Sequence, residues 1–158
     1  QVNNFFRRTA HKLTKADNVR TFVMVGSDGE LIGFYAVNAY AIDYTELPER
    51  FARNRPIHGS IPAAYISMIG VSSRFQGKGY GGDLLVDCLA RLAGAADALG
   101  IAVVLLDVLD CGDPEKVAKR LTLYTSYSFE PLPSNGLRLY LLVATVRALP
   151  KLTNHLPR

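Results

Sequence analysis

The sequence predicts a mixed α/β fold, in which a central and mostly antiparallel sheet is flanked by helices. Three observations predict it. A β-hairpin pattern occupies residues 20–42. A buried strand, a glycine-rich loop and a long amphipathic helix follow over 61–99, and a second buried strand leads to another helix within 101–127. Because 158 residues suffice for one well-filled core, we expect a single domain over residues 1–158.

The first element expected is an amphipathic helix over residues 5–13. Phe5, Phe6 and Leu13 form its apolar face, and basic side chains lie between them. The chain starts with Gln1, so this pattern begins almost at once. We therefore expect that native residues, including the start of this helix, precede Gln1.

The next elements are β-strands. The runs RTFVMV (20–25) and LIGFYAVNAYAI (31–42) are rich in strand-forming residues, and the Asp28-Gly29 step between them is a strong hairpin signal. The segment LPERFARNRP (47–56) is predicted to form a short helix or a loop. IPAAYISMIGV (61–71) then reads as a buried strand.

The second half alternates helices and strands. Apolar residues recur at helical spacing over 79–99, and Gly100 is expected to end that helix in the left-handed conformation. IAVVLLDV (101–108) reads as a buried strand, and Asp113-Pro114 should cap a helix over 114–127. SFEPL (128–132) and LRLYLLVATV (137–146) are expected as two strands joined by the turn PSNG.

Composition narrows the class of protein. No uncharged apolar run is long enough to cross a bilayer, and the two cysteines, Cys88 and Cys111, have no metal-ligand spacing. We therefore expect a cytoplasmic protein without a membrane anchor or a metal site. The net charge of +4 permits a polyanionic partner without requiring one.

The segment QGKGYGG (76–82) is the strongest functional signal. A Walker A loop is excluded, because Gly77-Lys78 is followed by Gly79 instead of Ser or Thr. The dinucleotide pattern G-x-G-x-x-G is met by Gly77, Gly79 and Gly82. Its first glycine should directly follow the strand, however, and five residues intervene here. A ligand-free glycine turn remains a third interpretation.

The loop closely resembles the pyrophosphate loop of the GCN5-related N-acetyltransferase (GNAT) superfamily, Q/R-x-x-G-x-G/A. Gln76, Gly79 and Gly81 match in register, and the resemblance runs from about residue 20 to 144. It implies a splayed sheet and acetyl-CoA as co-substrate. Glycines allow backbone N–H groups to approach the pyrophosphate at the start of the following helix. The residues expected to bind acetyl-CoA are Ile69, Gly70, Val71, Gln76, Gly77, Lys78, Gly79, Tyr80, Gly81 and Gly82.

The resemblance also implies a general acid. Family members often carry Y-x-x-x-G-F late in the fourth helix, and YTSYSF matches it through Tyr124 and Phe129, with Ser128 replacing the glycine. Tyr124 is thereby placed to protonate the departing thiolate, as a phenol of pKa about 10 can. Tyr127 is the rival candidate, and a buried aromatic without a catalytic role is the alternative for Tyr124.

No carboxylate stands out as a general base. Asp43 and Glu49 lie toward the acceptor side in a generic family member, but their spacing singles out neither. An α-amine, with a pKa of about 7.7 to 8.0, is partly neutral at cellular pH without help. The missing base therefore favours an α-amine acceptor.

Within the superfamily, the chain looks most like the acetyltransferase toxins of type II toxin-antitoxin modules. The likeness rests on RTFVMVGSDGELIGFYAV, IGVSSRFQGKGYGGDLL and LYTSYSF. It implies acetylation of the α-amine of aminoacyl-tRNA, a ribbon-helix-helix antitoxin, a homodimer and a first strand upstream of Gln1. Candidate basic contacts to tRNA are Arg7, Arg8, Lys12, Lys15, Arg50, Arg53, Arg55, Lys116, Lys119 and Arg120.

Two other functions stay open at this point. One is a housekeeping acetyltransferase that acts on a small amine or a protein N-terminus. The other is a non-catalytic module that binds coenzyme A or RNA. The three histidines, His11, His58 and His155, are scattered and are not expected to act in catalysis or metal binding. The stretch 110–120 is longer than the usual connection, and the sequence assigns it no role.

Overall fold

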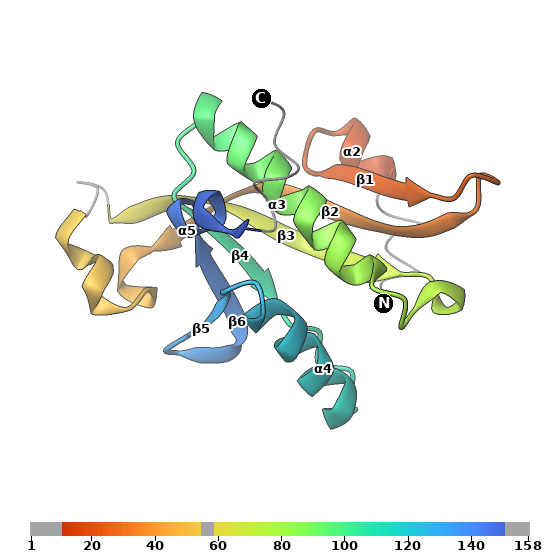
Figure 1. Cartoon of the computed structure of the whole chain (residues 1–158). Coiled ribbons are helices and arrows are strands. Elements are labelled where there is room, and N and C mark those ends of the chain that lie inside the picture. Colours follow the sequence, from red (N-terminus) through yellow and green to blue (C-terminus); the bar gives the residue numbers. More distant parts are fainter. Residues whose placement is uncertain (1–10, 55–58, 151–158) are drawn as a thin grey trace.

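The structure, a computed structural model, describes residues 11–54 and 59–150. Its centre is a six-stranded sheet with the order β1-β2-β3-β4-β6-β5 (Figure 1). Only the β3–β4 pair is parallel, and the other neighbours run antiparallel. The expected mixed α/β fold is confirmed. The helix expected over 5–13 lies mostly outside the described residues, which begin with α2 (His11–Lys15).

The hairpin forms as expected. β1 (Arg20–Val25) pairs with β2 (Leu31–Asp43) around a turn in which Gly29 adopts a φ of 81°. Two 3-10 turns, η2 (Tyr44–Glu46) and η3 (Glu49–Asn54), follow where a short helix or loop was predicted. β3 (Ser60–Val71) then pairs with β2 along nearly its whole length.

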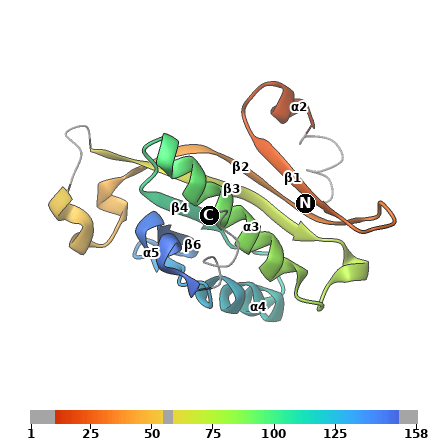
Figure 2. The same ribbon diagram turned by 45° about the horizontal axis from the view of Figure 1, so that its top comes forward.

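α3 (Tyr80–Ala98) crosses one face of the sheet, and β4 (Val103–Asp107) returns beside β3 (Figures 1 and 2). The helix ends where it was predicted to end, with Leu99 as the C-cap and Gly100 directly after it, but Gly100 is not among the glycines with a positive φ. Leu99 already leaves the helix in extended conformation (φ −131°, ψ 145°), so no left-handed residue is needed.

α4 (Pro114–Thr125) begins where Asp113 was expected to cap it: the carboxylate accepts from the N–H groups of Glu115 and Lys116. β5 (Glu130–Leu132) and β6 (Asn135–Leu142) form the last hairpin. The strand expected over 137–146 ends early, because Val143–Ala148 forms helix α5. Val143 and Val146, one helical turn apart, are buried in the core shared with α3, and this packing outweighs their strand propensity.

A bulge in β3 explains why the sheet opens. Ala36 pairs with Met68 and Val37 with Ile66, so Ser67 has no opposite residue in β2. The Ser67 hydroxyl donates to the Ala36 carbonyl oxygen at 3.2 Å. β3 and β4 are paired only from Ala63–Val103 to Ile66–Leu106. Because a bulge bends its strand, β3 leaves β4 from this point, and a gap opens toward Val71.

Two apolar cores lie on opposite faces of the sheet. The larger one, under α3, contains Leu85, Leu89 and Val104, together with Tyr124 of α4 and Tyr127 just after this helix. The smaller one includes Val103, Leu105 and Tyr140 and is covered by Leu47 and Phe51 of the η2–η3 segment. No helix in residues 11–54 and 59–150 is long and apolar enough to span a bilayer.

Candidate active site

The glycine loop connects the free end of β3 to the start of α3. η4 (Ser73–Phe75) turns the chain, and Gly77 and Gly79 adopt φ values of 77° and 89°. Side chains rarely tolerate this left-handed region, and no atom lies within 4 Å of a Cβ built at either position. The two glycines are thus required by the path of the loop and leave open space beside it.

The start of α3 presents backbone N–H groups to this open space. Gly79 is the N-cap residue, and no side chain caps the helix there. The first backbone N–H groups of a helix have no partner within it, and the helix dipole makes this end positive. An anion such as a pyrophosphate therefore fits at this position.

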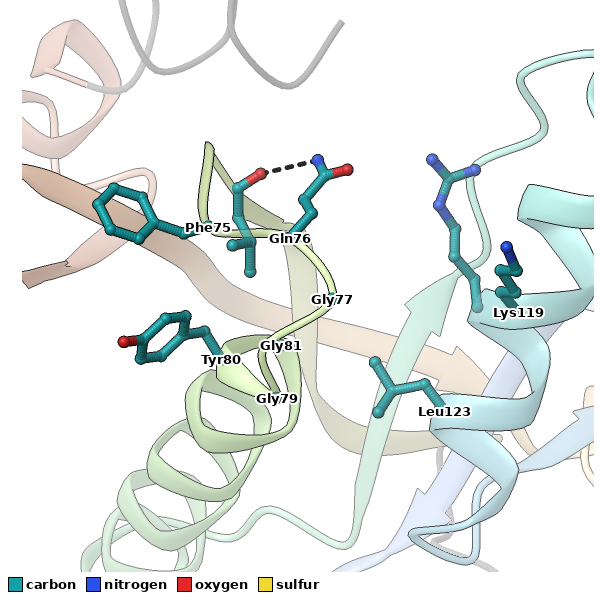
Figure 3. A pocket seen from close by; sticks show the side chains of 10 residues that line it. Phe75, Gln76, Gly77, Gly79, Tyr80, Gly81, Lys119 and Leu123 are labelled. Atoms are coloured by element: carbon teal, nitrogen blue, oxygen red, sulfur yellow. Dashed lines mark hydrogen bonds between the residues drawn. The ribbon is translucent and has the colours of Figure 1, made fainter. Parts of the chain in front are cut away.

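A pocket of about 280 Å³ lies between this loop and α4 (Figure 3). Six of the residues predicted to bind the cofactor line it: Val71, Gln76, Gly77, Gly79, Tyr80 and Gly81. Gln76 donates from Nε2 to the Val71 carbonyl oxygen at 3.1 Å, which fixes the loop against the strand. The predicted residues thus come together in one place.

Four residues lining this pocket were not predicted as cofactor contacts. They are Phe75, Lys119, Arg120 and Leu123. Lys119 and Arg120 were expected to contact tRNA, but both line this pocket from α4. Figure 3 shows Lys119 on the side of the pocket opposite to the loop. The three- and four-residue spacing of these two basic residues from Leu123 indicates a shared helix face, yet only the packing of α4 shows what this face meets.

The remaining predicted cofactor residues lie beside the pocket. Lys78 Nζ lies 5.4 Å from the centre of the Phe75 ring, so its charge sits over that ring. Gly82 faces Tyr127: a Cβ at this position would be 2.9 Å from the Tyr127 hydroxyl oxygen. Ile69 and Gly70 pair with Tyr35 and Phe34 of β2.

The backbone of β3 beyond the bulge has one free edge. The Ser72 N–H donates to Ile32 of β2 at 2.8 Å. Backbone groups of alternate residues point to opposite edges of a strand, so those of Ile69 and Val71 point into the gap beside β4. This edge offers main-chain hydrogen-bonding groups to an extended ligand.

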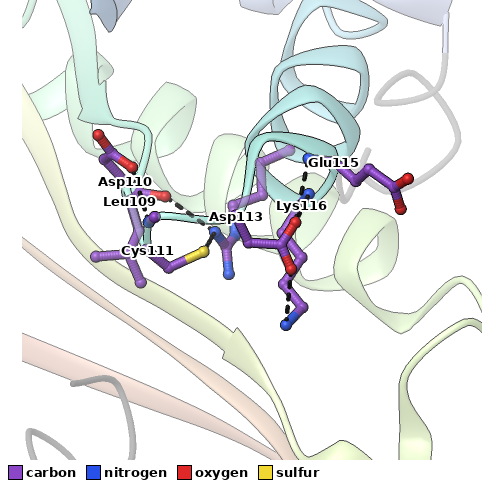
Figure 4. A network of polar contacts seen from close by, with 8 residues as sticks. Leu109, Asp110, Cys111, Asp113, Glu115 and Lys116 are labelled. Carbon is purple, nitrogen blue, oxygen red and sulfur yellow. Dashed lines mark hydrogen bonds and ion pairs between the residues drawn. The ribbon is translucent and has the colours of Figure 1, made fainter.

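The segment before α4 orients the side chain of Arg120 through Leu109 and Cys111, which are labelled in Figure 4. Arg120 donates to the Leu109 carbonyl oxygen at 2.9 Å and to the Cys111 sulfur at 3.2 Å. The Arg120 guanidinium lowers the pKa of the exposed Cys111 thiol. This segment, which the sequence left without a role, thereby fixes the direction of Arg120 at the pocket.

Tyr124 lies next to the larger core. Its side chain is 6% exposed, and its ring packs edge-on against Phe129 with the centres 6.1 Å apart. Burial raises the pKa of Tyr124 to about 12, which Arg120 partly opposes. The phenol is therefore protonated at neutral pH, as a proton donor must be. Tyr124 does not line the 280 Å³ pocket.

Ser128, which stands where the family pattern has glycine, lies in the turn after α4. Ser128 has a φ of 69°, the left-handed conformation that glycine adopts most easily. Serine at this position therefore adopts a conformation that glycine would adopt more easily, and it carries backbone strain.

Several other predicted residues are placed away from the pocket or outside the described part. Arg50 binds Glu130 and the Tyr140 hydroxyl, and Asp43 caps η2 through Thr45. Arg7, Arg8, Arg55, His58 and His155 are not among the described residues. Within the described part, no three His, Cys, Asp or Glu side chains are arranged to hold a metal ion.

The chain is similar to acetyltransferases and to toxins of known sequence. Residues 3–115 match the family model described as the Acetyltransferase (GNAT) family, a match that includes the glycine loop and ends before Tyr124. The chain is 63% identical to a probable toxin TacT of Sinorhizobium fredii (strain NBRC 101917 / NGR234), over 94% of this chain and 83% of the relative. It is 32% identical to a tRNA-acetylating toxin of Mycobacterium tuberculosis (strain ATCC 25618 / H37Rv), with the same coverage.

The fold resembles that of the toxin AtaT. A structure of AtaT complexed with acetyl-methionyl-tRNAfMet has a TM-score of 0.79, with 19% identity over 92% of this chain and 84% of AtaT. A tyrosine-to-phenylalanine mutant of AtaT, bound to acetyl-CoA and the C-terminus of the antitoxin AtaR, has a TM-score of 0.72. This AtaT mutant is 17% identical in sequence to the chain, over 93% of this chain and 82% of the AtaT chain.

Proposed function

The chain belongs to the acetyltransferase (GNAT) family, and from that premise we propose that it acetylates the α-amine of an amino acid charged on tRNA. Acetyl-CoA is the co-substrate of this family. Acetylated aminoacyl-tRNA has no free amine for peptide-bond formation, so the protein would block translation as a toxin. The named relatives support this choice of substrate, since one is a tRNA-acetylating toxin and another was solved with acetyl-methionyl-tRNAfMet.

One structural observation carries the proposal. The glycine loop, the uncapped start of α3 and the basic side chains of Lys119 and Arg120 meet at the open end of the gap between β3 and β4. The loop and the two basic residues fit the pyrophosphate of acetyl-CoA. The free edge of β3 at Ile69 and Val71 fits its extended pantetheine arm.

Acetyl-CoA supplies the acetyl group as a thioester. In the proposed reaction, the amine nitrogen forms a bond to the carbonyl carbon and the carbon–sulfur bond breaks. The main-chain N–H of Ile69, which points into the gap, stabilises the negative charge on the carbonyl oxygen. Tyr124 gives its phenolic proton to the departing sulfur, and the amine loses a proton to water.

We also propose an antitoxin of the ribbon-helix-helix type, a homodimer and a cytoplasmic location. The AtaT structure with the C-terminus of AtaR supports a protein antitoxin. A tRNA substrate supports the location. Size-exclusion chromatography with light scattering, on the toxin alone and with the antitoxin, tests the assembly directly.

The decisive experiment is a transfer assay with radiolabelled acetyl-CoA. Wild-type protein is given charged total tRNA, uncharged tRNA and a panel of small amines and N-terminal peptides. We expect label on charged tRNA only. Label on small amines or peptides instead would identify a housekeeping acetyltransferase, and acetyl-CoA binding without any product would identify a non-catalytic module.

Two variants test the proton donor. Tyr124→Phe removes the phenol and is expected to slow transfer by about 10²- to 10⁴-fold while acetyl-CoA binding persists. Tyr127→Phe is the matched control, because the Tyr127 hydroxyl lies against Gly82. Full activity of Tyr124→Phe would remove the assigned role, and loss of activity only in Tyr127→Phe would transfer it.

A further inference from the structure

A second polar cluster lies on the face of the sheet opposite to α3. It consists of Tyr65 on β3, Asp107 at the end of β4, and Arg138 on β6. The Asp107 carboxylate accepts from both Nε and one Nη of Arg138, at 2.7 and 2.8 Å, and from the Tyr65 hydroxyl at 2.8 Å. The exposed ring of Tyr40 borders the cluster, 5.5 Å from the Tyr65 ring.

The cluster lies where the gap in the sheet begins. The last paired residues of β3 and β4 are Ile66 and Leu106, and Asp107 is the next residue of β4. Asp107 shares the face of Val103 and Leu105, away from α3, because strand side chains alternate. A strand rises about 3.3 Å per residue, so this point lies about 16 Å along β3 from Val71. A thioester carbonyl held by the Ile69 N–H lies about 10 Å along β3 from this point, a distance that the carbonyl group, the attacking amine and a hydrogen bond to Asp107 can span.

We propose that Asp107 binds the α-amine of the acceptor, an inference that rests on the proposed function. An ionised carboxylate has about four lone-pair sites, and the three contacts above occupy three of them. The fourth is free to accept an N–H from the acceptor, and the Asp107 side chain is 37% exposed. The acceptor then enters from the face opposite to α3, while the loop holds the cofactor at the open end of the gap.

The charges around Asp107 allow a bound amine to stay neutral, as it must to act as a nucleophile. Hydrogen bonds from Arg138 and Tyr65 hold the pKa of Asp107 below its usual value, so the carboxylate is anionic and a poor base. Arg138 also balances its charge. A charge-balanced acceptor can orient a neutral amine by one hydrogen bond without strongly favouring the ammonium form, whose lone pair is not available for attack.

The chain contains a matched control on its other face. Asp87 on α3 accepts from the Tyr35 hydroxyl at 2.5 Å and from Arg91 Nε at 2.9 Å. Its side chain is 47% exposed, comparable to that of Asp107. Asp87→Asn therefore disturbs the same kind of tyrosine–carboxylate–arginine cluster on the opposite face of the sheet.

The test compares the binding of two tRNA ligands to the protein with coenzyme A present. One carries an amide-linked amino acid with a free α-amine, and the other carries its N-acetylated form. Wild type should bind the free amine roughly threefold to tenfold more tightly, the effect of one net hydrogen bond. Asp107→Asn should lose this preference and retain acetyl-CoA binding, whereas Asp87→Asn should keep the preference.

The outcomes separate this inference from the proposed function. If wild type transfers acetyl to charged tRNA but Asp107→Asn keeps its preference for the free amine, the role of Asp107 is overturned. If wild type transfers nothing to charged tRNA, the proposed function itself falls. Should Asp107→Asn fail to fold, Asp107→Glu replaces it: the charge stays and the carboxylate moves by one methylene. Loss of the preference in Asp107→Glu supports the contact, and retention overturns it.

Discussion

Gly33 lies where β2 comes closest to the cofactor-binding end of β3. A Cβ at this position would lie 2.7 Å from the Gly70 carbonyl oxygen, 2.7 Å from Leu84 Cδ1 and 3.3 Å from Val71 Cα. Ordinary contact begins near 3.4 Å, and two of these three atoms belong to the backbone. Gly33→Ala must therefore displace β3, because no flexible side-chain end can absorb the whole overlap.

The size of the effect follows from this overlap. Adding a methyl group to a tightly packed core costs about 1–3 kcal/mol, which for a domain of this length lowers Tm by roughly 2–12 °C. Displacement of this end of β3 should also weaken acetyl-CoA binding, because Ile69 and Val71 carry the main-chain groups assigned to the cofactor.

Gly94→Ala provides the control, since it makes the same chemical change with the opposite expected sign. Gly94 lies within α3, and no atom lies within 4 Å of a Cβ built there. Alanine is favoured over glycine in a helix by about 0.5–1 kcal/mol, so Tm should rise by roughly 1–4 °C. Scanning calorimetry and titration calorimetry with acetyl-CoA measure both variants. A Gly33→Ala protein as stable as wild type, with unchanged acetyl-CoA affinity, would refute the close approach of β2 and β3.

Further predictions concern the turn after α4, the phenol and the pocket. Ser128→Gly relieves the left-handed strain at φ 69° and should stabilise the protein by about 0.5–1 kcal/mol in thermal unfolding; a loss of stability would contradict this turn geometry. Because burial raises the pKa of Tyr124 to about 12, kcat/KM should rise with the neutral fraction of the α-amine up to about pH 8 and then stay level; a fall between pH 9 and 10 would argue against a raised pKa. Lys119→Met should weaken acetyl-CoA binding about threefold to tenfold at low salt and less at high salt; equal affinities at low salt would exclude a phosphate contact. The pKa of Asp107 is lowered in the folded state, so its stabilising contribution is complete above the unfolded value and is lost as pH falls through the folded value; the stability difference between wild type and Asp107→Asn should shrink below pH 3.8, and a constant difference would contradict the lowered pKa.

The sequence alone was sufficient for features whose cause is local. Apolar spacing predicted α3 to within one residue at each end, and Asp28-Gly29 and Asp113 predicted a turn and a helix cap. The glycine loop could be identified for the same reason, since Gly77 and Gly79 are needed for their own backbone conformation. Periodicity, caps and positive φ values all act over a few neighbouring residues, which a sequence pattern records.

The tertiary structure decided the features that depend on residues far apart in the chain. α5 forms because Val143 and Val146 meet α3, although both residues favour strands. Lys119 joins the loop through the placement of α4, and Asp107 gains its partners from two other strands. The sheet opens at a bulge at Ser67, between two strands of ordinary sequence. These contacts are set by packing between distant segments, and packing of this kind leaves no periodic signal in the sequence.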